Sequence, residues 1–154
     1  MEIRFFKPEG PHGFLSNYFR WRLVVACQRW ETVEHYYQAA KFSHLPELAE
    51  RIRLLPGPDA AKSFARERTA LWRADWWDVR EGVMWEVLNA KFKHSAFLTA
   101  ELLATNDARL VEASPYDDFW GMGSDGLGRN RLGEMLMLVR AQVRESASAN
   151  LPSA

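Results

Sequence analysis

The sequence predicts an α+β fold, a predominantly α-helical single domain with a few short β-strands. Several segments combine helical spacing of apolar residues with a capping residue at their start, whereas strand-like runs are short and end at turn residues. No repeat, low-complexity stretch or linker interrupts the 154 residues, which suffice for one core and are too few for two ordinary domains. We therefore expect one domain over residues 4–146 and a frayed tail over residues 147–154.

Short strands are expected near the N-terminus, and one further short element of unspecified type is expected later in the chain. The first ends before a segment rich in proline and glycine. Residues 13–19 then form a turn-rich loop, in which Ser16 and Asn17 stand between large apolar side chains. The expected strands cover residues 2–6 and 22–27, the latter followed by 28–30, and the further short element covers residues 107–113.

Helices are expected wherever apolar residues recur every three or four positions. Four of them begin after a residue that can cap the first turn, namely Thr32, Asp59, Asp75 or Ser95. The expected helices cover residues 33–44, 47–55, 60–68, 75–94, 96–105 and 132–145.

Composition excludes several classes of protein. Acidic and basic residues balance at 20 each, so no global field attracts nucleic acid or an anionic membrane. Cys27 is the single cysteine, which excludes an internal disulfide and a cysteine-based zinc site, and its apolar neighbours predict an inert buried thiol. No segment has the length of a signal peptide core or a membrane span, so we expect a cytoplasmic protein with no membrane partner. The oligomeric state stays open.

The segment T-V-E-H-Y-Y-Q-A-A-K-F, residues 32–42, is the first candidate site. Its polar side chains fall at i, i+3, i+4 and i+7 along one helical stripe with aromatic neighbours, namely Glu34, Tyr37, Gln38 and Lys41. Polar faces usually lack large rings and core faces usually lack charges, so this face resembles a pocket wall. The alternative is a solvated helix in which Glu34 and Lys41 are too far apart to interact.

The loop over residues 117–130 is the second candidate site. Glycines let backbone amides approach a ligand, and the loop leads into a helix whose N-terminal amides can receive phosphate. Glycines and aspartates are also ordinary turn formers, so Asp117 or Asp118 can simply close a turn. The loop places acidic, aromatic and basic residues among four glycines: Asp117, Asp118, Trp120, Gly121, Gly123, Asp125, Gly126, Gly128, Arg129 and Asn130.

Other chemistries find little support. The four histidines lack the spacing of a metal site, no serine occupies a nucleophile elbow, and the glycine loop is neither a P-loop nor a dinucleotide fingerprint. The carboxylates of Glu34 and Asp117 remain, together with an amine and aromatic rings. That set suits cleavage of a glycosidic bond, because one carboxylate can activate water or stabilise an oxocarbenium ion. We expect both acids to flank one ribose.

Six blocks of sequence, in order from about Phe5 to Arg144, resemble the NADAR family, also called YbiA-like. The blocks are G-F-L-S-N-Y-F, T-V-E-H-Y-Y-Q-A-A-K-F, L-N-A-K-F, L-L-A-T, L-V-E-A-S-P-Y-D-D-F-W-G-M-G and G-R-N-R-L-G-E-M-L-M. The resemblance implies an N-glycosidase that hydrolyses the bond between a ribose carbon and a nitrogen. One branch of the family releases ribose 5-phosphate from phosphorylated intermediates of riboflavin biosynthesis. Another removes ADP-ribose from modified guanine in nucleic acid.

The resemblance also implies roles for single residues. Glu34 would act as general base or oxocarbenium stabiliser, Asp117 would orient water or ribose hydroxyls, and Trp76 would stack on the heterocycle unless the adjacent Trp77 takes that role. Lys41 would bind phosphate or attack the anomeric carbon of an opened ribose to give a Schiff base. Trp76 can equally be a core anchor at the helix start. The other substrate-binding candidates are Asn17, Tyr37, Gln38, Trp120, Gly121, Arg129 and Asn130. Of these, Arg129 and Asn130, together with the amides of the glycine loop, are the candidates for the phosphate end of the substrate.

Three functions follow from these expectations. The first is an N-glycosidase for riboflavin-pathway intermediates, and the second acts on ADP-ribosylated nucleic acid, against which the balanced charge argues. The third is a non-catalytic module that binds a nucleotide or ADP-ribose and does not need Glu34. No metal or cofactor is expected, because a side chain can protonate the leaving heterocycle.

Overall fold

The computed structural model describes residues 1–149 and divides the chain into two compact units. One unit is Asn17–Lys91, and the other joins Met1–Ser16 to the chain from Phe92 onward. Each unit therefore contains its own set of helices and one pair of strands.

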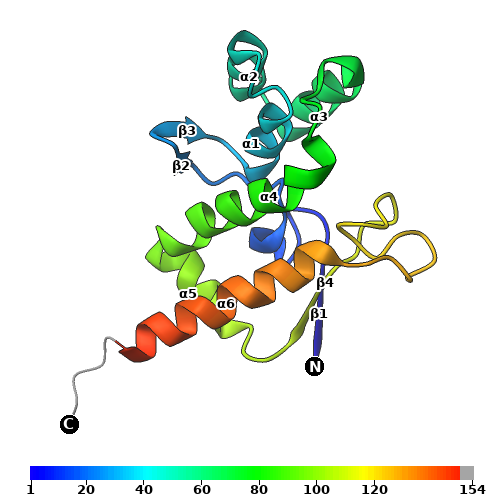
Figure 1. The fold of residues 1–154 in the computed structure, drawn as a ribbon. Helices are drawn as coiled ribbons and strands as arrows, with labels where there is room; N and C mark the ends of the chain where they lie inside the picture. Colours follow the sequence, from blue (N-terminus) through cyan, green and yellow to red (C-terminus); the bar gives the residue numbers. More distant parts are fainter. Residues whose placement is uncertain (150–154) are drawn as a thin grey trace. The chain divides into compact units, whose positions relative to one another are not determined.

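The Asn17–Lys91 unit is built around α1. Helices α2 and α3 both pack against α1, and the β2–β3 hairpin precedes it (Figure 1). The boundary to the other unit falls two residues before the end of α4. Its elements are β2 (Leu23–Val25), β3 (Gln28–Trp30), α1 (Val33–Ala40), α2 (Pro46–Arg53), α3 (Pro58–Arg66), the short 3-10 helix η2 (Thr69–Leu71) and α4 (Trp76–Lys93).

The hairpin places Cys27 in solvent, so the prediction of a buried thiol is wrong. Strands β2 and β3 pair antiparallel with Val25 opposite Gln28, which leaves Ala26 and Cys27 as a two-residue turn. Both turn residues have positive φ, 49° and 64°. Such a turn matches the twist of the strands and points its side chains away from the sheet. Turn geometry, rather than apolar neighbours, decides the exposure of this thiol.

The helices of this unit begin and end close to the predicted positions, with two differences. Thr32 caps α1 by accepting a hydrogen bond from the His35 amide, as expected, but α1 ends at Ala40 and turns follow to residue 44. The α3 helix begins two residues earlier than expected, with Gly57 at its N-cap and Pro58 in its first turn, so Asp59 does not cap it. Proline fits this position because the first amides of a helix have no intrahelical partner.

The second unit pairs the N-terminal strand with a strand more than 100 residues later. Strand β1 runs parallel to β4, from Glu2 opposite Arg109 to Phe5 opposite Glu112, and the two lie side by side in Figure 1. Helix α6 packs against both β4 and α5. The elements are β1 (Glu2–Phe5), the short 3-10 helix η1 (Gly13–Leu15), α5 (Ala96–Ala104), β4 (Arg109–Glu112) and α6 (Arg131–Ala149).

Helix α6 approaches β4 very closely at Gly133. A Cβ atom on Gly133 would lie 2.1 Å from the Leu110 carbonyl oxygen, so only glycine permits this contact. Leu132, Leu136 and Val139 then bury the same helix in the core. The helix continues to Ala149, three residues into the predicted tail, and residues 150–154 lie outside the described part of the chain.

The predicted fold class is confirmed: helices dominate and the strands are few and short. Within residues 1–149, no helix is long and apolar enough to span a membrane.

Candidate functional site

Glu34 is a buried carboxylate whose surroundings hold it at the start of α1. Its backbone amide donates to the Asn17 carbonyl oxygen at 3.1 Å, and its Oε1 accepts a hydrogen bond of 2.7 Å from Gln38 Nε2. Only 7% of Glu34 is exposed, and only 4% of Gln38. The one-turn separation of the two residues produces this contact directly, as the sequence stripe predicts.

Lys41 closes the same helix and is also buried. Its Nζ lies 3.8 Å from the centroid of the Trp72 ring and within 5.5 Å of the Tyr37 and Trp76 centroids. Burial lowers the pKa of Lys41 to about 8, an effect that the Glu34 charge opposes and the Lys62 charge adds to. About a tenth of Lys41 is therefore unprotonated at pH 7, a far larger fraction than for an ordinary lysine.

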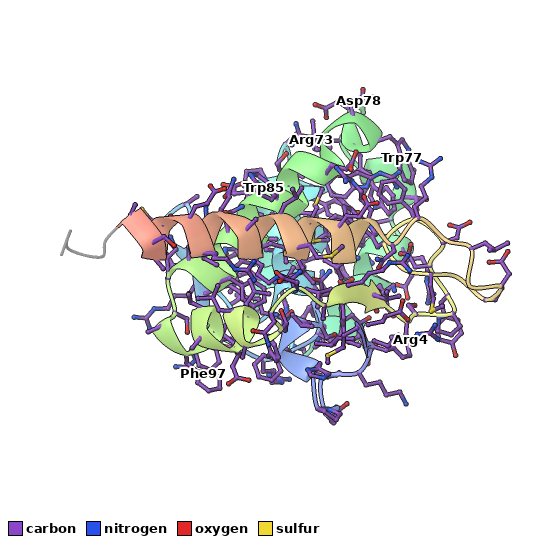
Figure 2. All side chains as sticks on the ribbon, turned by 90° about the horizontal axis from the view of Figure 1, so that it is seen from below. Arg4, Arg73, Trp77, Asp78, Trp85 and Phe97 are labelled. Atoms are coloured by element: carbon purple, nitrogen blue, oxygen red, sulfur yellow. The ribbon has the colours of Figure 1, made fainter. Side chains whose placement is uncertain are left out.

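An aromatic cluster surrounds Lys41. Trp76 meets Tyr37 edge-on at 4.9 Å between centroids and contacts Trp72 at 6.4 Å, and only 2% of Trp76 is exposed. Its neighbour Trp77 is 65% exposed, and Trp77 stands with Asp78 at the N-terminal end of α4 (Figure 2). Trp76 therefore serves as a core anchor in this structure, whereas a stacking role for either indole stays a prediction.

Trp72 is a site residue that the sequence did not single out. It is half-buried, its Nε1 donates to the Ala65 carbonyl oxygen at 2.9 Å, and its face holds the Lys41 ammonium. A single tryptophan in an irregular segment carries no helical or strand pattern. The run of aromatic residues from 72 to 77 was the only signal that could have identified it.

Two buried amide oxygens next to Glu34 have no hydrogen-bond partner. They are Gln38 Oε1 and Asn17 Oδ1. The Nδ2 atom of the same Asn17 side chain makes only a long contact of 3.7 Å to the Met84 sulfur. Unsatisfied buried acceptors are rare because each costs about 1–3 kcal/mol. Both can accept from hydroxyl or amino groups of a bound sugar, which agrees with the substrate-binding role that the sequence predicts for Asn17 and Gln38.

Helix α3 adds charges that the sequence did not link to the site. The Tyr18 hydroxyl is hydrogen-bonded to Asp59, and Tyr18 also experiences the charges of Glu34 and Arg66. Burial, with these two acids, raises the pKa of Tyr18 far above its usual range. Spatial proximity of α1 and α3 produces this cluster, and no sequence spacing reveals it.

In the second unit, Asp117 closes a turn. Its Oδ1 accepts hydrogen bonds from the Phe119 amide at 2.9 Å and the Trp120 amide at 2.7 Å, and its carbonyl accepts from Gly123. This is the turn-forming use that aspartates commonly have. The catalytic role that the family resemblance implies for Asp117 stays a prediction.

Asn130 fastens the glycine loop to β4. Its Oδ1 accepts from the Glu112 amide and its Nδ2 donates to the Leu110 carbonyl, both at 2.9 Å, in a residue that is 4% exposed and has φ of 52°. Asparagine tolerates this left-handed conformation better than most residues. Both ends of the predicted phosphate-binding amide are thus engaged with backbone.

The remaining loop groups are mostly engaged as well. Gly121 packs so tightly that a Cβ would lie 3.0–3.1 Å from Asp117 and Glu112 atoms. Trp120 is buried and Phe119 meets it edge-on, while Arg129 is exposed and lies 5.7 Å from the Phe119 ring centroid. The backbone amides that were expected to face a ligand instead donate hydrogen bonds to carbonyl oxygens of the loop. The donors are the amides of Gly123, Gly128, Arg129, Asn130, Arg131 and Leu132, and their acceptors are, in the same order, the carbonyls of Asp117, Met122, Asp118, Gly121, Phe119 and Trp120.

The predicted residues therefore form two groups. Glu34, Tyr37, Gln38, Lys41 and Trp76 come together in the Asn17–Lys91 unit with Asn17, whereas the loop residues belong to the other unit. The convergence of both acids on one ribose stays a prediction. Among residues 1–149, no three His, Cys, Asp or Glu side chains gather in a way that could hold a metal ion.

Comparison with protein-family models assigns the chain to a family. The model of the NADAR domain matches residues 4–144, which is most of the chain. This chain belongs to the NADAR family. The family resemblance predicted from the six sequence blocks is thereby confirmed.

Named relatives match over almost the whole chain. N-glycosidase YbiA of Escherichia coli (strain K12) is 41% identical over 141 residues, which cover 92% of this chain and 88% of the relative. N-glycosidase Npun_R5314 of Nostoc punctiforme is 39% identical over 150 residues, 96% of each chain. Riboflavin biosynthesis protein VVA0006 of Vibrio vulnificus is 43% identical over 151 residues, but this chain spans only 40% of its length.

A solved structure confirms the YbiA-like fold. The NMR structure of E. coli YbiA superposes with a TM-score of 0.88 at 38% sequence identity, and the match covers 98% of this chain and 91% of that one.

Proposed function

We propose that this NADAR protein is an N-glycosidase that hydrolyses the ribose C–N bond of phosphoribosylated intermediates in riboflavin biosynthesis and releases ribose 5-phosphate. Relatives named N-glycosidase and riboflavin biosynthesis protein support the bond type and the substrate class. The observation that carries the proposal is the buried pair of Glu34 and Lys41 on one helix, with unpartnered amide acceptors beside it. A cytoplasmic location, expected from the sequence, belongs to the same proposal.

Glu34 suits the central step of such a hydrolysis. As the ribose C1–N bond breaks, positive charge develops on the ribose ring, and a buried carboxylate stabilises that charge strongly. Glu34 can instead remove a proton from water while the water oxygen bonds to C1, and the departing nitrogen gains a proton. Gln38 Nε2 fixes the carboxylate orientation for either task.

Lys41 offers a second route through the same site. A lysine with a pKa of about 8 is partly unprotonated at neutral pH, so its amine can attack C1 of a ring-opened ribose. The C1–N bond to the heterocycle then breaks, and water hydrolyses the resulting Schiff base to release sugar and amine. The aromatic cluster of Tyr37, Trp72 and Trp76 keeps the amine desolvated and holds it in place.

The roles of the second unit are part of the proposal. Asp117 would orient water or ribose hydroxyls through the carboxylate oxygen that does not close the turn. In the Asn17–Lys91 unit, Trp76 or Trp77 would contact the heterocycle. Trp120, Gly121, Arg129 and Asn130 would contact the substrate. The turn and strand contacts of Asp117 and Asn130 hold this loop in a fixed form.

A release assay tests the proposal. The purified protein is incubated separately with the phosphoribosylated riboflavin intermediates and with ADP-ribosylated DNA, and free ribose 5-phosphate and free guanine are measured. We expect sugar phosphate release from the first set. Release of guanine alone would make the protein an ADP-ribosyl glycohydrolase, and ADP-ribose binding without any turnover would make it a binding module.

Two chemical probes refine the assay. Glu34→Gln keeps the side-chain shape but removes the charge, and should abolish release, whereas Glu47→Gln removes an exposed carboxylate on α2 and should not. Borohydride added during turnover should attach the sugar covalently to Lys41 if the Schiff-base route operates. Turnover with no adduct at Lys41 leaves direct attack by water as the mechanism.

A further inference from the structure

We propose that Lys62 and Arg66 on helix α3 bind the phosphate group of the substrate. This inference rests on the proposed function, because it assigns the phosphate end of the same substrate. It places the phosphate next to α1 within the Asn17–Lys91 unit, instead of at Arg129 and Asn130, which the sequence suggested.

The two cations lie on one face of α3. Lys62 and Arg66 are one turn apart and both exposed, and Asp59 lies one turn earlier on the same face. The opposite face, formed by Ala61, Phe64 and Ala65, is buried. Helix α3 packs against α1, so the position of this charged face is fixed relative to Glu34 and Lys41.

Electrostatic contacts connect this face to the buried site. The charge of Lys62 acts on the Lys41 ammonium, and the charge of Arg66 acts on Tyr18, whose hydroxyl is bonded to Asp59 and which also experiences Glu34. Two groups of the site therefore experience the charges of two α3 residues that lie one turn apart. A negatively charged group of a ligand bound at Glu34 or Lys41 would experience the same two positive charges.

The two α3 cations have no acidic partner in the part of the chain that the structure describes. Neither Lys62 nor Arg66 makes an ion pair within residues 1–149, and Lys41 makes none either. The charge of Lys62 thus acts on the Lys41 ammonium, and Arg66 lies one turn from Lys62, although like charges repel. A phosphate group carries about −1.5 to −2 charges near pH 7 and accepts several charge-assisted hydrogen bonds. Such an anion relieves the repulsion and supplies the missing partners.

The glycine loop is a poorer phosphate site. Its amides, and the first amides of α6, already donate to carbonyls inside the loop, and both ends of the Asn130 amide bind β4. A phosphate there would have to break several of these hydrogen bonds. On α3, no ion pair of Lys62 or Arg66 within residues 1–149 has to be broken.

Calorimetric binding of ribose 5-phosphate, compared with ribose, tests the proposal without requiring turnover. The wild-type protein should bind ribose 5-phosphate at least about tenfold more tightly, since each charge-assisted contact contributes that order of affinity. Lys62→Gln and Arg66→Gln should each remove about tenfold of this preference, and added salt should weaken it because both residues are exposed. Arg29→Gln, which removes an exposed cation on β3, should leave it unchanged.

Conservative variants separate a lost charge from a lost fold. Lys62→Arg and Arg66→Lys retain the charge and should retain most of the preference, and circular dichroism should show the same fold in every variant. During turnover, Lys62→Gln should raise KM for a phosphorylated substrate far more than it lowers kcat.

The outcomes for this inference and for the proposed function differ. A wild-type protein that binds ribose and ribose 5-phosphate equally, or Gln variants that keep the full preference, overturns the assignment to α3. The protein could also show a phosphate preference that depends on Lys62 and Arg66 and yet release no sugar from any substrate. That result would reject the proposed glycosidase function and would support the phosphate site on α3.

Discussion

Helix α1 and the loop over residues 117–130 both contain acidic and amide side chains, but the hydrogen bonds of these side chains differ between the two regions. In α1, Gln38 leaves a buried oxygen without a partner, and Lys41 at its C-cap lies among aromatic rings with no ion pair to any residue from 1 to 149. In the loop, Asn130 uses both ends of its side chain on β4, and Asp117 uses one oxygen to close a turn. Because unsatisfied buried polar groups are costly, they persist where a ligand completes them, whereas fully bonded groups maintain structure.

The largest expected difference between the two regions is in activity. Glu34→Gln should lower kcat by about 10²- to 10⁴-fold, the range of a lost general base or charge stabiliser. Asp117→Asn keeps the Oδ1 acceptor of its turn and should lower kcat by about tenfold, through misplaced water or ribose. Steady-state kinetics on the phosphoribosylated substrate give both values. Equal losses would show that the two acids act as one unit across the two regions.

For stability we expect the opposite order, with a larger loss in the loop than in α1. Asn130→Ala leaves the Glu112 amide and the Leu110 carbonyl without partners and forces alanine into a left-handed conformation, so the free energy of unfolding should fall by about 3 kcal/mol. Gln38→Ala removes one buried contact to Glu34 and should cost about 1 kcal/mol. Urea unfolding followed by tryptophan fluorescence measures both. A larger loss for Gln38→Ala would contradict the structural assignment of the loop.

These contrasts show what the sequence could predict. Helical spacing predicted that Glu34 and Gln38 meet, because the contact lies within one turn of one helix. The capping roles of Thr32 and Ser95 were equally local and are confirmed. The roles of Trp72 and Lys62 depend on packing between separate elements, for which one sequence has no local signal.

Local patterns also misled in two places. Apolar neighbours suggested a buried Cys27, but a two-residue turn exposes it. The glycines of the loop suggested open amides for a phosphate, but the loop amides bond to loop carbonyls. In both cases backbone geometry overrode composition, and backbone geometry depends on which partners the chain finds.

The ionisation of Lys41 gives a smaller effect that sharpens the picture of α1. Its reactivity toward an amine-acylating reagent should rise with pH around a midpoint of about 8. Glu34→Gln removes a charge that favours the ammonium, so the midpoint should move down, and Lys62→Gln removes a charge that opposes it, so the midpoint should move up. Mass spectrometry of the Lys41 peptide over a pH series measures this. If the midpoint is the same in Lys62→Gln as in the wild type, the charge of Lys62 does not act on Lys41, and α3 is not part of the site.

The smallest effect concerns His35, beside Glu34 on α1 but directed into the structure. Its Nδ1 lies 2.8 Å from Thr32 Oγ1 and its Nε2 lies 3.0 Å from the Leu55 carbonyl oxygen, which fits a neutral ring that donates from Nε2. Burial lowers the pKa of His35, and the Arg20 charge adds to this, while the Leu55 carbonyl and Glu31 oppose it.

The His35 ring binds a proton less readily in the folded protein than in the unfolded chain. The contribution of neutral His35 to the free energy of unfolding is therefore complete above about pH 6.5, and it is lost as the pH falls toward the lowered pKa of His35. Urea unfolding of the wild type should therefore show stability that declines below pH 6.5, and His35→Gln should be less stable overall but lack this part of the decline. His12→Gln is a matched control, since His12 lies in the other unit and should leave the decline unchanged. An identical decline in His35→Gln would mean that other groups destabilise the protein in acid, and that His35 joins α1 to Leu55 without sensing pH.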